Sequence, residues 1–215
     1  MLFYDYDRSS AAYRVRIALA IKGISVERRF VHLLRAEQRL PAYLEKNPQG
    51  LVPALELDDG TVLTQSLAII EYLETLQPNP RLVPADPVLA ARVRAAALAI
   101  ACDTHPLGNL RVVTYLQERL AQSEAVVLEW RRHWVRLGLD AVEALIRPSP
   151  FCFTAAPTIA DICLAPQLFY AERFGVTLET YPKIGAVAAA CAEHPAFRAA
   201  HPAAHPDAAE AAPGP

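Results

Sequence analysis

Two adjacent hydroxyls, Ser9 and Ser10, stand where a helical pattern begins, directly after a short apolar segment. The first turn of a helix presents unpaired backbone N–H groups and a partial positive charge, which stabilise an anion such as a thiolate. A serine hydroxyl at this place can donate a hydrogen bond to that anion. The alternative is that one of the two serines only caps the helix.

A second candidate region interrupts a long helical stretch. Residues 103–111 contain His105, Pro106, Gly108 and Asn109 within an otherwise Ala- and Leu-rich pattern. Sharp breaks in a helix have identifiable causes. Either the kink serves packing and leaves His105 and Asn109 on the surface, or these side chains face a ligand.

The elements that must position Ser9 follow one another as strand, helix, strand, a short helix, a hairpin and a closing helix. We expect them over residues 2–6, 13–22, 26–31, 37–46, 54–57 with 61–64, and 67–76. Gly23 ends the first helix, and Asp58-Asp59-Gly60 suits the hairpin turn. The order βαβ followed by ββα predicts a mixed, thioredoxin-like sheet in a domain over residues 1–77.

A proline-rich linker over residues 78–87 separates this domain from a helical one. Asp86 is expected to cap the next helix, with Pro87 at its first position. Helical patterns over 88–121, 124–147, 158–173 and 183–193 predict an all-α domain over 88–198, so the fold class is α+β. Thr158 and Asp161 have the spacing of a capping box, which we prefer to an acid–base role for Asp161. Residues 199–215, rich in Ala and Pro, are expected to form a flexible tail.

The composition is that of a globular protein with a full core: 215 residues, 53% hydrophobic and 20% charged. A net charge of -2 gives no general attraction to nucleic acid. The four cysteines lack the paired spacing of a metal site, so no metal is expected. The apolar runs are too short to cross a membrane, and the chain opens with a strand pattern instead of a signal peptide. We therefore expect a cytoplasmic protein.

Five short segments spread along the chain have a recognisable sequence: Arg8-Ser9-Ser10, residues 13–19, Asn47-Pro48-Gln49, residues 65–73 and residues 105–109. This set resembles the zeta class of the glutathione transferases, which includes maleylacetoacetate and maleylpyruvate isomerases. The resemblance extends from the first strand to about Asp207. Where the family usually has Ser-Ser-Cys, this chain has Ala11 as the third residue.

The resemblance implies glutathione as the cofactor. Ser9, supported by Ser10, would be the catalytic hydroxyl that donates to the thiol sulfur. A cis peptide bond before Pro53 would turn the Val52 backbone toward the cysteinyl part, which then pairs like an added strand. The implied glutathione contacts are Ser9, Gln38, Val52, Pro53, Gln65, Ser66, His105 and Asn109. Gln38 and His32 are the weaker candidates, for the glycyl end, and the alternatives are a loop role for Val52 and a helix cap for Ser66.

A maleyl substrate carries carboxylates, which guanidinium groups bind through paired hydrogen bonds. We expect Arg8, Arg111 and Arg173 to bind this small diacid, the alternative being solvated surface charges. Arg14 and Arg16 are expected to be structural.

The predicted function is glutathione-dependent cis–trans isomerisation of maleylpyruvate or maleylacetoacetate, through reversible addition of the thiolate to the double bond. The resemblance also implies a homodimer. One alternative is a general glutathione transferase or one that removes halide from α-haloacids. The other is a non-catalytic binding or regulatory protein, against which Ser9 argues, because a scaffold needs no hydroxyl that activates a thiol.

Overall fold

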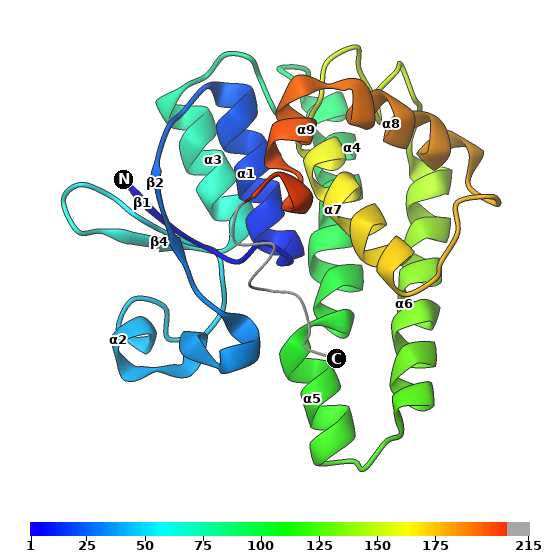
Figure 1. Ribbon diagram of the computed structural model, residues 1–215. Coiled ribbons are helices and arrows are strands. Elements are labelled where there is room, and N and C mark those ends of the chain that lie inside the picture. Colours follow the sequence, from blue (N-terminus) through cyan, green and yellow to red (C-terminus); the bar gives the residue numbers. More distant parts are fainter. Residues whose placement is uncertain (206–215) are drawn as a thin grey trace. The chain divides into compact units, whose positions relative to one another are not determined.

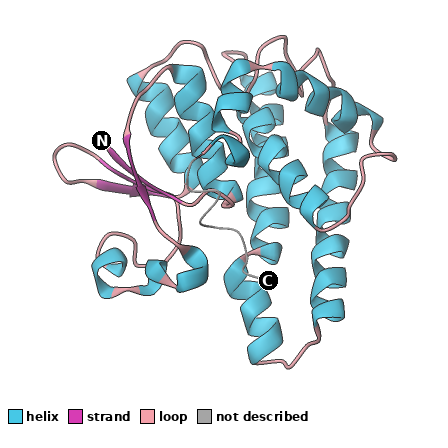
Figure 2. Ribbon diagram, in the orientation of Figure 1, coloured by secondary structure: helices cyan, strands magenta, loops and turns pink. Residues whose placement is uncertain are grey.

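The computed structural model describes residues 1–205 and divides into two compact units (Figures 1 and 2). The first unit contains Met1–Arg81 together with the segment that starts at His194, and the second contains Leu82–Glu193. The first domain therefore extends beyond the predicted boundary at residue 77. Its last part also comes from the far end of the chain, which the sequence pattern did not indicate.

The first unit is built on a four-stranded mixed sheet in the order β2-β1-β3-β4. Its strands are β1 (Leu2–Asp5), β2 (Glu27–Phe30), β3 (Ala54–Glu56) and β4 (Val62–Thr64). Strand β1 runs parallel to β2, with Phe3 opposite Arg28, and antiparallel to β3, with Phe3 opposite Leu55. The expected thioredoxin-like sheet is confirmed.

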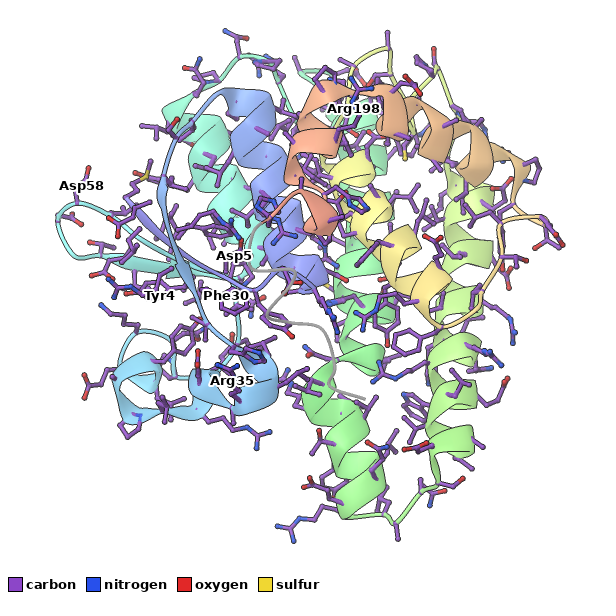
Figure 3. The ribbon with its side chains drawn as sticks, viewed as in Figure 1. Tyr4, Asp5, Phe30, Arg35, Asp58 and Arg198 are labelled. Carbon is purple, nitrogen blue, oxygen red and sulfur yellow. The ribbon has the colours of Figure 1, made fainter. Side chains whose placement is uncertain are left out.

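Neighbouring residues of β1 point to opposite faces of the sheet, because side chains alternate along a strand. Asp5 points toward α1 (Ser10–Lys22), whereas Tyr4 points to the side of α2 (Pro41–Leu44), as Figure 3 shows. Tyr4 packs edge-on against Tyr43, with ring centroids 5.6 Å apart. The closing helix α3 (Ser66–Leu76) packs beside α1. Strand β1 thus ends between two packed layers, and Tyr6, Asp7 and Arg8 connect it to Ser9.

The single helix expected over residues 37–46 is wrong. The segment instead forms a 3-10 turn, Glu37–Arg39, followed by the short helix α2, and another 3-10 turn, Leu33–Arg35, precedes it. Ala36 adopts a left-handed conformation with φ of 58° and separates the two turns. Pro41 then starts α2, since proline suits the first position of a helix.

The C-terminal segment packs on the first unit up to His205. Helix α9 (Pro195–Ala200) lies against α1, and a 3-10 turn follows over Pro202–Ala204. Ala200 and Pro202 are buried, so the flexible tail predicted from residue 199 is wrong for residues 199–205. Small alanine side chains allow this close approach to α1. Residues 206–215 of the predicted tail lie outside the described residues.

The second unit is helical throughout its main elements. It contains α4 (Pro87–Leu98), α5 (Leu110–Glu118), α6 (Glu124–Leu145), α7 (Ile159–Arg173) and α8 (Pro182–Glu193). The expected cap is confirmed, since Asp86 Oδ1 accepts from Leu89 N–H at 2.7 Å. The capping box is also confirmed: Asp161 Oδ2 accepts from Thr158 N–H at 2.7 Å. Within residues 1–205, no helix is both long and apolar enough to cross a membrane.

Candidate active site

Ser9 is the N-cap of helix α1, and its Oγ accepts from Ala12 N–H at 3.2 Å. The capping interpretation is therefore correct as local geometry. A serine hydroxyl has one donor and two acceptor positions, however, and this bond uses an acceptor. Among the described residues Oγ makes no other hydrogen bond, so its O–H can still donate to an anion at the helix N-terminus. Capping and thiol activation are compatible at Ser9.

The two neighbours of Ser9 in the sequence differ in burial. Ser10, the first residue of α1, is buried, and Arg8 is half-buried. Arg8 Nε lies 3.9 Å from Asp7 Oδ2. Asp7 is 2% exposed, and its burial raises the pKa of the carboxyl above the usual value, against the opposing effects of Arg8 and Arg16.

The Val52-Pro53 peptide bond is cis, as expected. Two side chains hold the preceding carbonyl of Leu51: Tyr43 Oη donates to it at 2.6 Å and Asn47 Nδ2 at 2.7 Å. Burial raises the pKa of Tyr43, so its hydroxyl keeps its proton and remains a donor. The Val52 backbone makes no hydrogen bond to another described residue. It is therefore available to an extended ligand.

Helix α3 begins at a strained residue. Gln65 has φ of 69°, a conformation that residues other than glycine adopt at a cost and that clusters at functional sites. Gln65 is the N-cap of α3, so the alternative that Ser66 caps this helix is wrong. Within the described chain, no Gln65 side-chain bond caps α3, which leaves N–H groups at this helix mouth for a carboxylate. Ser66 is buried, and its Oγ accepts from Arg14 Nη1 at 3.3 Å.

Gln38 and His32 differ in what their side chains do. Gln38 is 5% exposed, and its Oε1 accepts no hydrogen bond from another described residue. His32 Nδ1 accepts from Arg35 N–H at 3.3 Å and so caps a 3-10 turn, while its ring packs against Tyr6. Gln38 therefore stays a candidate, and so does His32, because its cap uses only Nδ1.

The predicted helix break in the second unit is built from two unusual turns. A π-helical turn, Ala99–Thr104, is followed by a 3-10 turn, His105–Gly108. The π turn closes where Thr104 Oγ1 donates to Ala99 O at 2.8 Å. Such turns in the middle of a helix often mark functional sites. Asn109 caps α5, and no side-chain bond of Asn109 to a described residue accompanies the cap.

Side chains from α6 and α7 hold this break in place. Trp130 Nε1 donates to Leu107 O at 2.8 Å, and Arg131 Nη1 donates to Gly108 O at 3.0 Å. Tyr170 Oη also donates to Gly108 O at 3.0 Å, and burial raises the pKa of Tyr170, so it keeps the proton that it donates. A side chain at Gly108 would place its first carbon 2.2 Å from Tyr170 Oη, which explains the glycine.

Arg131 also connects the break to the end of α7, because its guanidinium lies 4.4 Å from the centre of the Phe174 ring. Sequence reasoning missed this residue. No local pattern marked it, because its partners Gly108 and Tyr170 lie far away in the sequence.

The predicted site residues fall into two groups. The first unit carries Arg8, Ser9, Ser10, Gln38, Val52, Pro53, Gln65 and Ser66. The second unit carries His105, Asn109, Arg111 and Arg173. Arg111 and Arg173 are exposed, whereas His105 and Asn109 are half-buried. Arg173 lies at the end of α7, 5.6 Å from the centre of the Phe174 ring.

Comparison with known proteins gives the family. The model of the glutathione S-transferase N-terminal domain matches residues 3–81, and that of the C-terminal domain matches residues 124–210. The maleylacetoacetate isomerase of Pseudomonas aeruginosa is 51% identical over 209 residues, which cover 96% of this chain and 98% of that protein. The chain belongs to the glutathione S-transferase family. The maleylpyruvate isomerase of a Ralstonia species is 46% identical over 213 residues, covering 97% and 100% of the two chains.

Solved structures place this transferase in the zeta class. A bacterial zeta-class maleylpyruvate isomerase in a holo form superposes with a TM-score of 0.92 at 45% identity, covering 96% of this chain and 99% of that one. A maleylacetoacetate isomerase from Anaeromyxobacter dehalogenans, solved with dicarboxyethyl glutathione and citrate in the active site, gives a TM-score of 0.86 at 43% identity. That comparison covers 96% of each chain.

Proposed function

We propose that this transferase is a glutathione-dependent cis–trans isomerase of maleylacetoacetate or maleylpyruvate. The curated relatives that match nearly the whole chain carry these two names. The observation that carries the proposal is Ser9, a half-buried hydroxyl at the N-terminus of α1 whose donor position is not used by the described residues. An isomerase of this kind needs such a donor to keep a thiol ionised.

The residues of the first unit fit glutathione. Ser9 O–H would donate to the sulfur, and the partial positive charge at the start of α1 would add to the stabilisation. The Val52 backbone would pair with the cysteinyl segment. The N–H groups at the start of α3, with Gln65 and Ser66, would hold the γ-glutamyl carboxylate. Gln38 Oε1, which accepts from no described residue, would receive a peptide N–H near the glycyl end.

Bound glutathione supplies a thiolate that adds reversibly to the cis double bond, so that rotation and elimination give the trans isomer. Ser9 holds the thiol in its charged form before the addition. Arg8, Arg111 and Arg173 bind the carboxylates of the substrate. Their positive charges also stabilise the negative charge that develops on the substrate carbonyl oxygen during the addition. His105 and Asn109 contact the glutathione or the substrate from the helix break. Ala11 leaves this chemistry intact, because glutathione itself brings the sulfur.

We also propose a homodimer in the cytoplasm. Within residues 1–205, Cys102, Cys152, Cys163 and Cys191 form no disulfide, as is usual in a reducing compartment. The dimer follows from the class and is tested by light scattering. A mass close to 23.6 kDa at micromolar concentration would contradict it.

The function is tested with both maleyl acids and two cofactors that differ only at the sulfur. With glutathione we expect conversion to the fumaryl isomer, seen by proton NMR. With S-methylglutathione, which keeps the peptide and lacks an ionisable thiol, we expect no conversion. Isomerisation at equal rates with both peptides would contradict the proposed role of the thiolate.

A further inference from the structure

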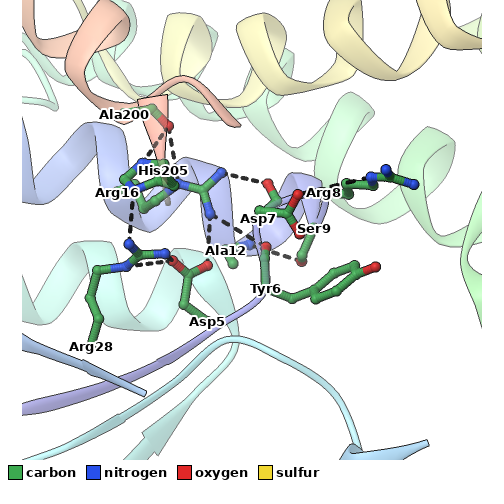
Figure 4. A network of polar contacts seen from close by, with 10 residues as sticks. All are labelled: Asp5, Tyr6, Asp7, Arg8, Ser9, Ala12, Arg16, Arg28, Ala200 and His205. Carbon is green, nitrogen blue, oxygen red and sulfur yellow. Dashed lines mark hydrogen bonds and ion pairs between the residues drawn. The ribbon is translucent and has the colours of Figure 1, made fainter. Parts of the chain in front are cut away.

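Arg16 links the sheet to the turn that precedes Ser9 (Figure 4). This buried arginine of α1 donates from Nη1 to Asp5 Oδ1 at 2.7 Å and to Tyr6 O at 3.3 Å. Its Nη2 donates to Asp7 O at 2.8 Å. Ser9 N–H itself donates to Tyr6 O at 3.0 Å. Arg16 thus fixes the backbone from which the Ser9 hydroxyl projects.

The C-terminal segment supplies a further partner of Arg16. Arg16 Nε donates to Ala200 O at 3.0 Å. The ring of His205 lies beside the same carbonyl, with Nε2 3.3 Å from Ala200 O and Nδ1 2.8 Å from Arg28 Nη1. Arginine offers only donors, so Nδ1 accepts and Nε2 carries the proton. His205 therefore donates to Ala200 O and holds this carbonyl against Arg16.

Asp5 closes the network from the sheet side. It is fully buried, and its Oδ2 accepts from Arg28 Nε at 2.9 Å and Nη2 at 2.6 Å, while Oδ1 accepts from Arg16. The planar fork of each guanidinium gives these bonds fixed directions. Figure 4 shows the result as one continuous set of contacts from His205 through Arg28, Asp5 and Arg16 to the turn before Ser9.

Resting on the proposed function, we infer that Arg16 is a positioning residue for Ser9 and that the segment Ala200–His205 contributes to thiol activation through Arg16. Hydrogen bonds favour donor angles above about 150° and weaken steeply below about 120°. A rotation of the turn before Ser9 that turns the hydroxyl away from the sulfur would therefore weaken the bond to the thiolate while leaving the hydroxyl present. The residues at the end of the chain thus act on the reaction without touching the sulfur.

Two variants and one matched control separate positioning from general stability. Arg16→Lys keeps a positive charge for Asp5, but an ammonium on a flexible stem cannot serve the same set of carbonyls in one fixed geometry. His205→Ala leaves the Asp5–Arg16 ion pair in place. The control is Lys22→Gln: Lys22 is buried at the opposite end of α1, pairs with Glu74 and donates to Pro80 O at 2.6 Å.

The readout is the pKa of the thiol of bound glutathione, titrated by the ultraviolet absorbance of the thiolate in the full-length protein. We expect Arg16→Lys to raise this pKa by about one unit, a tenfold loss in the thiolate-to-thiol ratio. His205→Ala should give a smaller rise. Lys22→Gln should lower the melting temperature without moving the thiol pKa. In a Ser9→Ala background, Arg16→Lys should cause no further shift.

A rise with Lys22→Gln equal to that with Arg16→Lys would overturn the inference, as would an Arg16→Lys shift that persists without the Ser9 hydroxyl. If Arg16→Lys does not fold, an unchanged thiol pKa in His205→Ala overturns it and a raised one supports it. A wild-type protein that binds glutathione without lowering its thiol pKa would contradict the proposed function as well. A lowered wild-type value with unshifted variants contradicts the positioning role alone.

Discussion

Replacing Ser9 with alanine removes two interactions of different size. The first is the cap on Ala12 N–H at 3.2 Å, whose loss costs about 1 kcal/mol of folding stability. The second is the proposed donation to the thiolate, for which a hydrogen bond to a charged group is worth about 1.5–3 kcal/mol. That energy corresponds to about one to two units in the pKa of the bound thiol. The chemical effect should therefore exceed the effect on stability.

Two companion variants separate the two interactions at Ser9. Ser9→Thr keeps both the acceptor for the cap and the donor for the sulfur, so stability and thiol pKa should stay near the wild-type values. Ser9→Asp keeps a good cap, but its carboxylate offers no donor and repels a thiolate. Ser9→Asp should therefore have a melting temperature close to that of the wild type. Its thiolate absorbance and turnover should instead be as low as those of Ser9→Ala.

The measurement at Ser9 is a pH titration of thiolate absorbance in each variant with saturating glutathione, together with kcat at neutral pH. We expect the wild type and Ser9→Thr to hold a low thiol pKa, and Ser9→Ala and Ser9→Asp to lose about tenfold or more in the thiolate-to-thiol ratio. An Ala variant with the wild-type thiol pKa would refute the reasoning, because Ser9 would then be only a cap.

Three further predictions concern the substrate, the core and pH. Arg173→Met should raise KM for the maleyl acid about tenfold or more with little change in glutathione affinity, and equal losses for both ligands would point to a folding role instead. Asp161→Ala should destabilise the protein by about 3–5 kcal/mol, because it removes three hydrogen bonds of a buried carboxylate. Asp161 Oδ1 accepts from Cys152 N–H at 2.7 Å, and Oδ2 accepts from Thr158 N–H at 2.7 Å and from Thr158 Oγ1 at 2.9 Å. The measurement is urea unfolding, with the exposed Asp103→Ala variant as the control. Asp7→Asn should leave stability unchanged in acid and increase it progressively as the pH rises above about 4, because burial raises the folded-state pKa of Asp7 and the ionised form is the disfavoured one. A gain that is the same at every pH would show that ionisation of Asp7 does not matter.

The parts of the fold that sequence predicted rest on local signals. Gly23, with φ of 64°, ends α1, and Asp86 caps α4, because caps involve residues within a few positions of each other. The capping box at Thr158 and Asp161 is of the same kind. The mixed sheet followed from the order of its strands and helices.

The parts that sequence did not predict depend on contacts between distant residues. Arg16 and Ala200 are 184 positions apart, and the Ala- and Pro-rich composition around Ala200 gives no sign of the hydrogen bond. Arg131 and Tyr170 meet at the helix break across 39 positions. Tertiary packing decides such contacts, and propensity and periodicity carry no information about them. The site residues that the resemblance implied remain proposals for this chain.

The central claim is that glutathione acts as a recycled cofactor at Ser9, and the most direct measurement uses a limiting amount of it. The protein is mixed with a large molar excess of maleylpyruvate or maleylacetoacetate over glutathione, and both the fumaryl product and the free thiol are followed by proton NMR. The account predicts that the cis acid is converted completely and that all glutathione is recovered. Conversion that stops after one product molecule per glutathione, with the thiol consumed, would contradict it.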